Sequence, residues 1–71
     1  MDLMTVPIGQ EYIIEGIAAG DAGLENFLFT LGFYIGEPIT VVSRRRSSCT
    51  VAVKYSRYSI DPQLARAITV A

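Results

Sequence analysis

The chain has 71 residues, enough for a single domain (residues 1–71) with a modest hydrophobic core. Apolar residues make up 51% of it and charged residues 18%, and six Lys and Arg oppose seven Asp and Glu for a formal net charge of -1. This balance argues against a dedicated nucleic-acid-binding protein, which needs a strongly basic face. So little charge also favours association between copies, and we therefore count a homo-oligomer among the expected states.

The residue types present restrict the chemistry that the chain can perform. It lacks histidine, the commonest general base and metal ligand, and its one cysteine, Cys49, has no partner for a disulfide bond. An unpaired thiol fits a reducing compartment. One cysteine without histidine cannot supply the usual zinc ligands, and no base stands beside a nucleophile. We therefore expect no catalytic residue, no metal site and no cofactor, and we predict that the protein is not an enzyme.

No segment has the form of a targeting signal or of a membrane span. The longest charge-free stretch, residues 26–36, is far shorter than the about 18 apolar residues that a span needs. We therefore expect a cytoplasmic protein that reaches a membrane only through a partner.

Residues 11–18 are predicted to form the first strand. Ile14 and Ile17 are three residues apart, and a regular strand would point them to opposite faces. A β-bulge at Gly16, which lies between them, would bring both side chains to the core. The alternative is a strand that is buried on both faces.

The clearest helix of the chain starts after Asp21 and ends before Gly32. The Asp21 carboxylate can accept from the first free N–H groups, and Gly32 can adopt the left-handed conformation that ends many helices. Apolar residues at i, i+3, i+4 and i+7 define the expected core face of this helix. They are Leu24, Phe27, Leu28 and Leu31.

Three aromatic residues near the end of this helix are candidates for a partner-binding surface. Phe29 lies on the side opposite the expected core face, and Phe33 and Tyr34 follow the helix directly. An exposed cluster of these three rings would form a contact surface. The alternative is that the barrel wraps round the helix and covers Phe29.

Two strands of a hairpin are predicted next, at residues 39–44 and 49–55, with a polar loop at residues 45–48. In the second strand, every other residue is expected to face the core. These residues are Cys49, Val51, Val53 and Tyr55.

The C-terminal part continues with a turn and a short strand within residues 56–60, a brief helix at residues 63–66 that Asp61 caps, and a closing strand at residues 67–70. Several short, evenly spaced strands in a small chain favour a barrel. We therefore predict a mainly β fold with one or two short helices, arranged as a small β-barrel.

Arg44, Arg45 and Arg46 form the one run of like charge. They can make an electrostatic contact with an acidic partner, with lipid headgroups or with RNA, or they can simply keep a hairpin tip solvated. A single run of three arginines is a weak nucleic-acid signal, because affinity for nucleic acid comes from many phosphate contacts. We therefore keep the three arginines as candidate partner-binding residues and expect no nucleic-acid partner.

Several short motifs keep a fixed order and spacing along the chain. Residues 28–36 (Leu-Phe-Thr-Leu-Gly-Phe-Tyr-Ile-Gly) follow the pattern Leu-x-x-Leu-Gly-apolar-x-x-Gly at the end of the predicted helix. The other motifs are Gly9, Ile14, Gly16 and Ile17 in the first strand, Ile39, Val41, Val51 and Val53 in the hairpin, and Ile60, Ala67, Ile68, Thr69 and Val70 at the end. With these motifs, residues 3–70 resemble the FeoA family, whose helix-end signature has the same pattern.

The resemblance implies an SH3-like β-barrel without catalytic residues. FeoA proteins are cytosolic accessories of the ferrous-iron transporter FeoB, in a family associated with transition-metal ions. The implied role is to bind FeoB on its cytoplasmic GTPase side and to modulate transport or complex assembly. Because the same domain occurs at the C-terminus of iron-dependent repressors, the alternative is a stand-alone protein-interaction barrel that acts in metal-responsive regulation.

Overall fold

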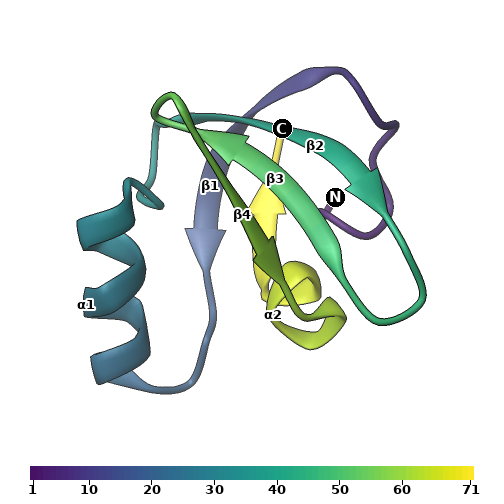
Figure 1. The fold of residues 1–71 in the computed structure, drawn as a ribbon. Coiled ribbons are helices and arrows are strands. Elements are labelled where there is room, and N and C mark those ends of the chain that lie inside the picture. Colours follow the sequence, from purple (N-terminus) through teal and green to yellow (C-terminus); the bar gives the residue numbers. More distant parts are fainter.

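Five strands form one antiparallel sheet in the order β4-β3-β2-β1-β5 in the computed structural model, which describes all residues 1–71 (Figure 1). The elements in chain order are β1 (Glu11–Ile17), α1 (Ala22–Leu31), β2 (Pro38–Arg44), β3 (Cys49–Val53), β4 (Ser56–Ile60), α2 (Pro62–Ala67) and β5 (Ile68–Val70). The helix α2 connects the two edge strands, β4 and β5, and so helps to close the sheet into a barrel. The predicted fold class, mainly β with one or two short helices, is confirmed, and the structure has two.

Two irregularities in strand pairing bend the sheet. The pairing of β1 with β5 shifts between Ile14 and Gly16, where Glu15 is the extra residue, and the pairing of β2 with β3 shifts between Val41 and Ser43. Such bulges increase the local twist, which lets a short sheet curl around a core. The predicted bulge at Gly16 is confirmed, since Ile14 is buried and Ile17 packs against the same core.

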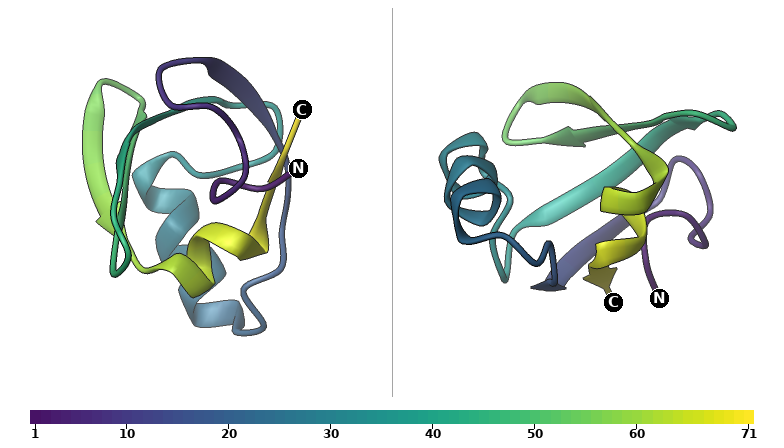
Figure 2. Two further views of the ribbon diagram at one scale, coloured as in Figure 1. Left: turned by 90° about the vertical axis from the view of Figure 1, so that its right-hand side faces the viewer. Right: turned by 90° about the horizontal axis from the view of Figure 1, so that it is seen from below.

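The core lies inside the curled sheet, between the β3–β4 hairpin on one side and β1 with β5 on the other (Figure 2). The N-terminal segment and α2 close one end, held by hydrogen bonds from the Leu3 N–H to the Ala65 carbonyl (3.2 Å) and from the Val70 N–H to the Met1 carbonyl (2.8 Å). Every strand except β4 supplies fully buried residues. The buried hydrophobic residues are Leu3, Val6, Ile14, Leu28, Phe33, Ile39, Val41, Cys49, Val51, Val53, Ala65, Ile68 and Val70.

The turn between β3 and β4 differs from the sequence prediction. The predicted strand at residues 49–55 ends at Val53, which pairs with Ser56 and leaves a two-residue turn. Lys54 and Tyr55 both have positive φ, 52° and 68°. The prediction that Tyr55 faces the core is wrong, because the chain reverses before it and its side chain is fully exposed.

The last elements differ from prediction only in their bounds. β4 takes all of residues 56–60, while α2 is longer than the predicted residues 63–66 and β5 is one residue shorter than the predicted residues 67–70. The predicted cap is confirmed, because the Asp61 carboxylate accepts from the Leu64 N–H at 2.8 Å. Neither helix is long and apolar enough to cross a membrane.

Candidate functional site

The helix α1 forms as its sequence predicts. The Asp21 carboxylate accepts from the N–H groups of Gly23 (2.8 Å) and Leu24 (3.2 Å), two of the donors that the first turn leaves free. At the other end, Gly32 takes the left-handed conformation with φ 103° and donates its N–H to the Phe29 carbonyl. Both predicted ends of the helix are confirmed.

The face that α1 turns to the core is much narrower than predicted. Leu28 is the one buried residue of the helix, and Leu31 packs partly against the core. Leu24 and Phe27 were expected to be in the core, but their side chains are 36% and 58% exposed. The helix stands at the side of the barrel, so only the residues nearest the sheet reach the core (Figure 1).

The predicted aromatic cluster is only partly brought together. The Phe29 and Tyr34 rings lie with their centroids 5.0 Å apart, a favourable aromatic contact, and Phe29 is 61% exposed. Phe33 is buried and packs against Tyr58 instead, with ring centroids 5.6 Å apart. Its placement in an exposed cluster is therefore wrong. After the left-handed turn at Gly32, the Phe33 N–H bonds to the carbonyl of Leu28 (2.9 Å), the buried residue of α1, and the Phe33 side chain lies in the same core cluster.

Lys54 links the β3–β4 turn to the end of α1. Its stem lies so close to Gly32 that a Cβ built there would be 2.5 Å from Lys54 Cγ. Its Nζ is 3.2 Å from Glu37 Oε1 and 5.3 Å from the centre of the Tyr34 ring. The contacts with Tyr34 and then with Glu37 raise the pKa of Lys54 above its ordinary value of 10.5. Sequence reasoning missed this contact, because no local pattern joins residues 34, 37 and 54.

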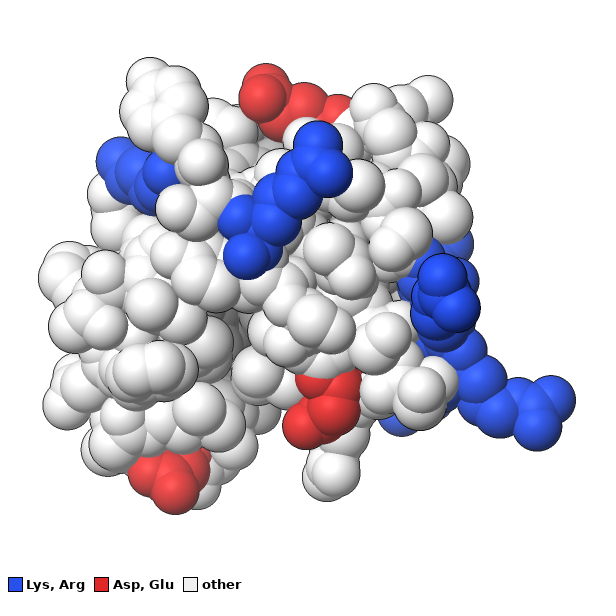
Figure 3. Space-filling model, viewed as in Figure 1, with Lys and Arg blue, Asp and Glu red and all other residues white.

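The exposed apolar side chains around α1, together with the half-buried Tyr34, form what we call the α1 surface. Its members lie on two flanks of the helix and in the loop that follows: Leu24, Phe27, Phe29, Tyr34 and Ile35. On this side of the molecule Figure 3 shows mostly uncharged atoms, with a basic group above the upper end of the helix and an acidic group near its lower end. A hollow of about 280 Å³ between Leu24, Leu64 and small alanine side chains borders one flank.

The three arginines of residues 44–46 do not form one exposed basic patch. Arg44 is half-buried, and its Nη1 donates to the carbonyls of Leu3 (3.0 Å) and Val6 (2.8 Å), so it is fastened to the N-terminal segment and does not stand free at the hairpin tip. It faces the N-terminal segment because it is still part of β2, whereas Arg45 and Arg46 lie beyond the strand and are exposed. Only these last two remain as candidates for an electrostatic contact.

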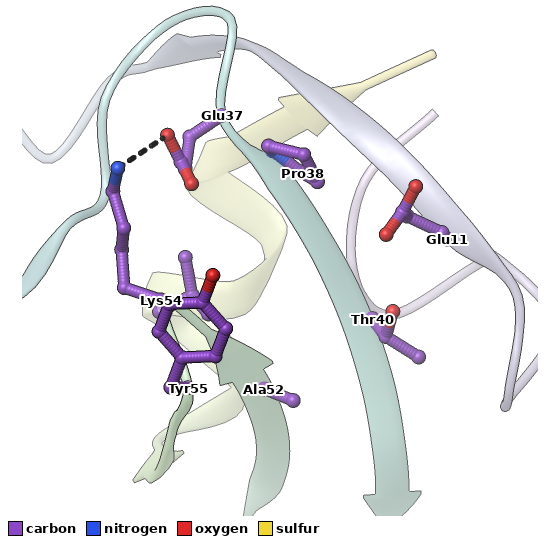
Figure 4. A pocket seen from close by; sticks show the side chains of 8 residues that line it. Glu11, Glu37, Pro38, Thr40, Ala52, Lys54 and Tyr55 are labelled. Atoms are coloured by element: carbon purple, nitrogen blue, oxygen red, sulfur yellow. Dashed lines mark ion pairs between the residues drawn. The ribbon is translucent and has the colours of Figure 1, made fainter.

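A second hollow, the β-groove, crosses the outer face of β1, β2 and β3 (Figure 4). Its volume is about 370 Å³, and its eight lining residues are Glu11, Glu37, Pro38, Thr40, Ala52, Val53, Lys54 and Tyr55. Sequence reasoning did not single out this groove, because its residues come from strands that only the fold brings side by side.

The groups that could carry reaction chemistry do not assemble into a site. No three His, Cys, Asp or Glu side chains come together as a group that could hold a metal ion. Cys49 is buried, and burial raises the pKa of its thiol, with a smaller opposing effect from Arg44. A thiol that resists ionisation is a poor nucleophile and a poor metal ligand.

The fold defines a small SH3-like β-barrel. The family model of the FeoA domain matches residues 1–71, the whole chain. This chain therefore belongs to the FeoA family, a small family associated with ferrous iron transport and not a known enzyme family.

Solved structures agree with this fold. FeoA of Stenotrophomonas maltophilia in complex with zinc, described as an SH3 domain protein and a candidate ferrous iron transport activating factor, is 25% identical over 100% of this chain and 89% of that chain, with a TM-score of 0.83. FeoA of Chlorobium tepidum is 21% identical over 99% of this chain and 68% of that chain, with a TM-score of 0.88. A manganese-dependent transcriptional repressor is 19% identical over 99% of this chain and 40% of its own, with a TM-score of 0.86. The last two show the fold alone, and no curated protein matches the chain.

Proposed function

We propose that this chain is a cytoplasmic accessory of ferrous iron uptake that binds the FeoB-type transporter on its GTPase side and modulates transport or complex assembly. Membership of the FeoA family over the whole chain is the observation that carries the proposal. The chain brings no group of metal-binding side chains together, which fits a protein that acts by contacting another protein. Recruitment to the inner face of the cell membrane would then come through FeoB.

The α1 surface is the part of the molecule that we assign to this contact. Phe27, Phe29 and Ile35 are 58%, 61% and 71% exposed, which brings no stability to the isolated domain. Burying one such side chain against a partner contributes about 1.5–3 kcal/mol. Aromatic residues also dominate the energetics of protein interfaces, so Phe29 is the expected anchor.

The surroundings of Phe29 favour a preformed contact. Tyr34 packs against its ring, and the Tyr34 ring also contacts Lys54 Nζ, which lies 5.3 Å from the ring centre. The 3.2 Å ion pair with Glu37 in turn holds Lys54 in place. A side chain that is already fixed loses less conformational entropy when a partner covers it. The aromatic pair of Phe29 and Tyr34 is therefore a suitable docking point.

The proposal is tested by a pull-down of the tagged chain against detergent-solubilised membranes from cells grown with little oxygen and little iron. Phe29→Ser is compared with wild type, and Ile8→Ser serves as a matched control, since Ile8 is 51% exposed in the segment before β1. We expect FeoB with wild type and with Ile8→Ser, and at least about tenfold less with Phe29→Ser, the factor that 1.4 kcal/mol produces. Absence of FeoB with all three would contradict the proposal.

The second candidate function is metal-responsive regulation by contact with another protein. The observation in its favour is the likeness of this fold to part of a manganese-dependent transcriptional repressor. Deletion of the chain separates the two candidates. Unchanged iron uptake with altered metal-responsive transcription would support regulation and argue against the transport role.

A further inference from the structure

The β-groove has a floor of small side chains between taller walls. Glu11 pairs with Thr40 across β1 and β2, Thr40 pairs with Ala52 across β2 and β3, and Ala52 pairs with Arg57 across β3 and β4. These four residues form a row on the outer face of the sheet, with the exposed Glu11 and Arg57 at its two ends. Because Thr40 and Ala52 are small, the middle of the row is hollow. Glu11 closes one side of the hollow and Tyr55 stands over the other (Figure 4).

Tyr55 is held in a conformation that a tyrosine rarely adopts. It has φ 68° in the tight β3–β4 turn, where glycine or asparagine is the usual residue, and its ring is fully exposed. Neither the backbone conformation nor the exposure stabilises the domain. The ring lines the groove and is exposed, so it is open to stacking on a cation or a planar group.

The groove carries one unpaired negative charge. Lys54 pairs with Glu37 in the only ion pair of the chain, whereas Glu11 is exposed and has no cationic partner. A cation between the Glu11 carboxylate and the Tyr55 ring would gain an ion pair on one side and a cation–π contact on the other. A planar guanidinium suits this position better than an ammonium, since it can stack and pair at once.

The chain itself presents such guanidinium groups. Arg45 and Arg46 are exposed at the β2–β3 tip, where the Arg45 N–H bonds to the Ser48 carbonyl at 2.8 Å, and neither has an acidic partner. Figure 3 shows basic side chains that project from the body of the molecule beside this hairpin. The tip cannot reach the groove of its own chain, since the two lie at opposite ends of the seven-residue strand β2, about 20 Å apart.

We propose that the Arg45–Arg46 tip of one copy inserts into the β-groove of a second copy, between Glu11 and Tyr55. The contact joins two different surfaces, so it is head-to-tail and produces a closed ring or an open chain of copies. It does not depend on FeoB, and its four side chains lie outside the α1 surface. The small net charge of -1 offers little repulsion between copies.

Two one-sided variants test the proposal. Glu11→Arg reverses the charge of the groove and leaves the tip unchanged. The double variant Arg45→Glu with Arg46→Glu reverses the charge of the tip and leaves the groove unchanged. Sedimentation velocity should show wild type associating with rising concentration and each variant alone at least about tenfold weaker. An equimolar mixture of the two variants should form a dimer with one copy of each, because one supplies the tip and the other the groove.

Two further measurements separate this contact from others. Tyr55→Asn should keep the turn, since asparagine tolerates positive φ, yet weaken association because the ring is gone. Raising the salt from about 0.1 M to about 1 M should also weaken it, because the Debye length falls from about 10 Å to about 3 Å. A wild type that stays monomeric at low salt, or a mixture that forms no dimer, would overturn the proposal. Binding of a short arginine peptide to the groove of a strictly monomeric wild type would likewise overturn it, because the occupant would then be another protein.

Discussion

Arg44 acts as a structural residue although it belongs to a run of three arginines. Its Nη1 donates to the carbonyls of Leu3 and Val6 and so fastens the N-terminal segment to the end of β2. Leaving a partly buried carbonyl without a donor costs about 1–3 kcal/mol. We predict that Arg44→Gln lowers the free energy of unfolding by about 2 kcal/mol in urea denaturation, whereas Arg45→Gln changes it by less than about 0.5 kcal/mol. Equal effects of the two substitutions would contradict this role.

Cys49 gives the stability of the domain a pH dependence. Burial raises the pKa of its thiol above the ordinary value of 9.0, and Arg44 offsets part of this rise. The unfolded chain therefore loses the thiol proton first as the pH rises, and the folded state loses stability relative to it. The effect is absent below about 9.0 and grows above it.

We therefore predict that wild type loses more stability than Cys49→Ala when the pH is raised above 9.0. Denaturant titrations of both proteins, at neutral pH and at several higher values, measure the difference. Comparing the two proteins removes the contribution of Lys54, whose raised pKa also lowers stability at high pH. If the free energy of unfolding fell with pH in the same way for both proteins, burial would not raise the pKa of the Cys49 thiol.

At the scale of the elements, the end of α1 depends on Gly32. Its φ of 103° disfavours any other residue, and an added Cβ would meet Lys54 Cγ at 2.5 Å. Gly36 has a similar φ of 94° but open space around it, so it serves as a matched control. We predict that Gly36→Ala costs about 1 kcal/mol of unfolding free energy and that Gly32→Ala costs at least about 1 kcal/mol more. Adding Lys54→Ala should recover part of that difference.

The helix α1 is held to the barrel through one buried side chain. Leu28→Ala should lower the free energy of unfolding by about 2–4 kcal/mol, whereas Phe27→Ala should change it by less than about 0.5 kcal/mol. Thermal or urea denaturation of both variants checks this. A large loss of unfolding free energy for Phe27→Ala would contradict this account. It would mean that the wider core face of α1 predicted from the sequence does pack against the barrel.

Local signals were sufficient to predict the elements, but not the faces that they present. Asp21 and Gly32 mark the ends of α1 by capping chemistry, which depends only on nearby residues. Phe27 and Phe33 were placed on the wrong sides, because their burial depends on where the barrel stands relative to the helix. Tyr55 was assigned to a strand because alternation alone does not show where a two-residue turn begins.

At the scale of the whole molecule, family membership was predictable and the arrangement of surfaces was not. The order and spacing of the motifs indicated a FeoA-like barrel, which the match over residues 1–71 confirms. The β-groove depends on Glu11, Thr40 and Ala52 lying in one row, and only strand pairing produces that row. Lys54 lines this groove and also contacts Tyr34 of the α1 surface, so the two surfaces share the β3–β4 turn.

Uptake of radioactive ferrous iron by cells that lack this chain tests most directly whether it supports transport through the α1 surface. Wild type and Ile8→Ser should restore uptake when expressed at equal levels. Phe29→Ser should restore much less, because it removes the exposed anchor without touching the core. Full uptake without the chain, or full rescue by Phe29→Ser, would contradict the proposed role of this surface in iron transport.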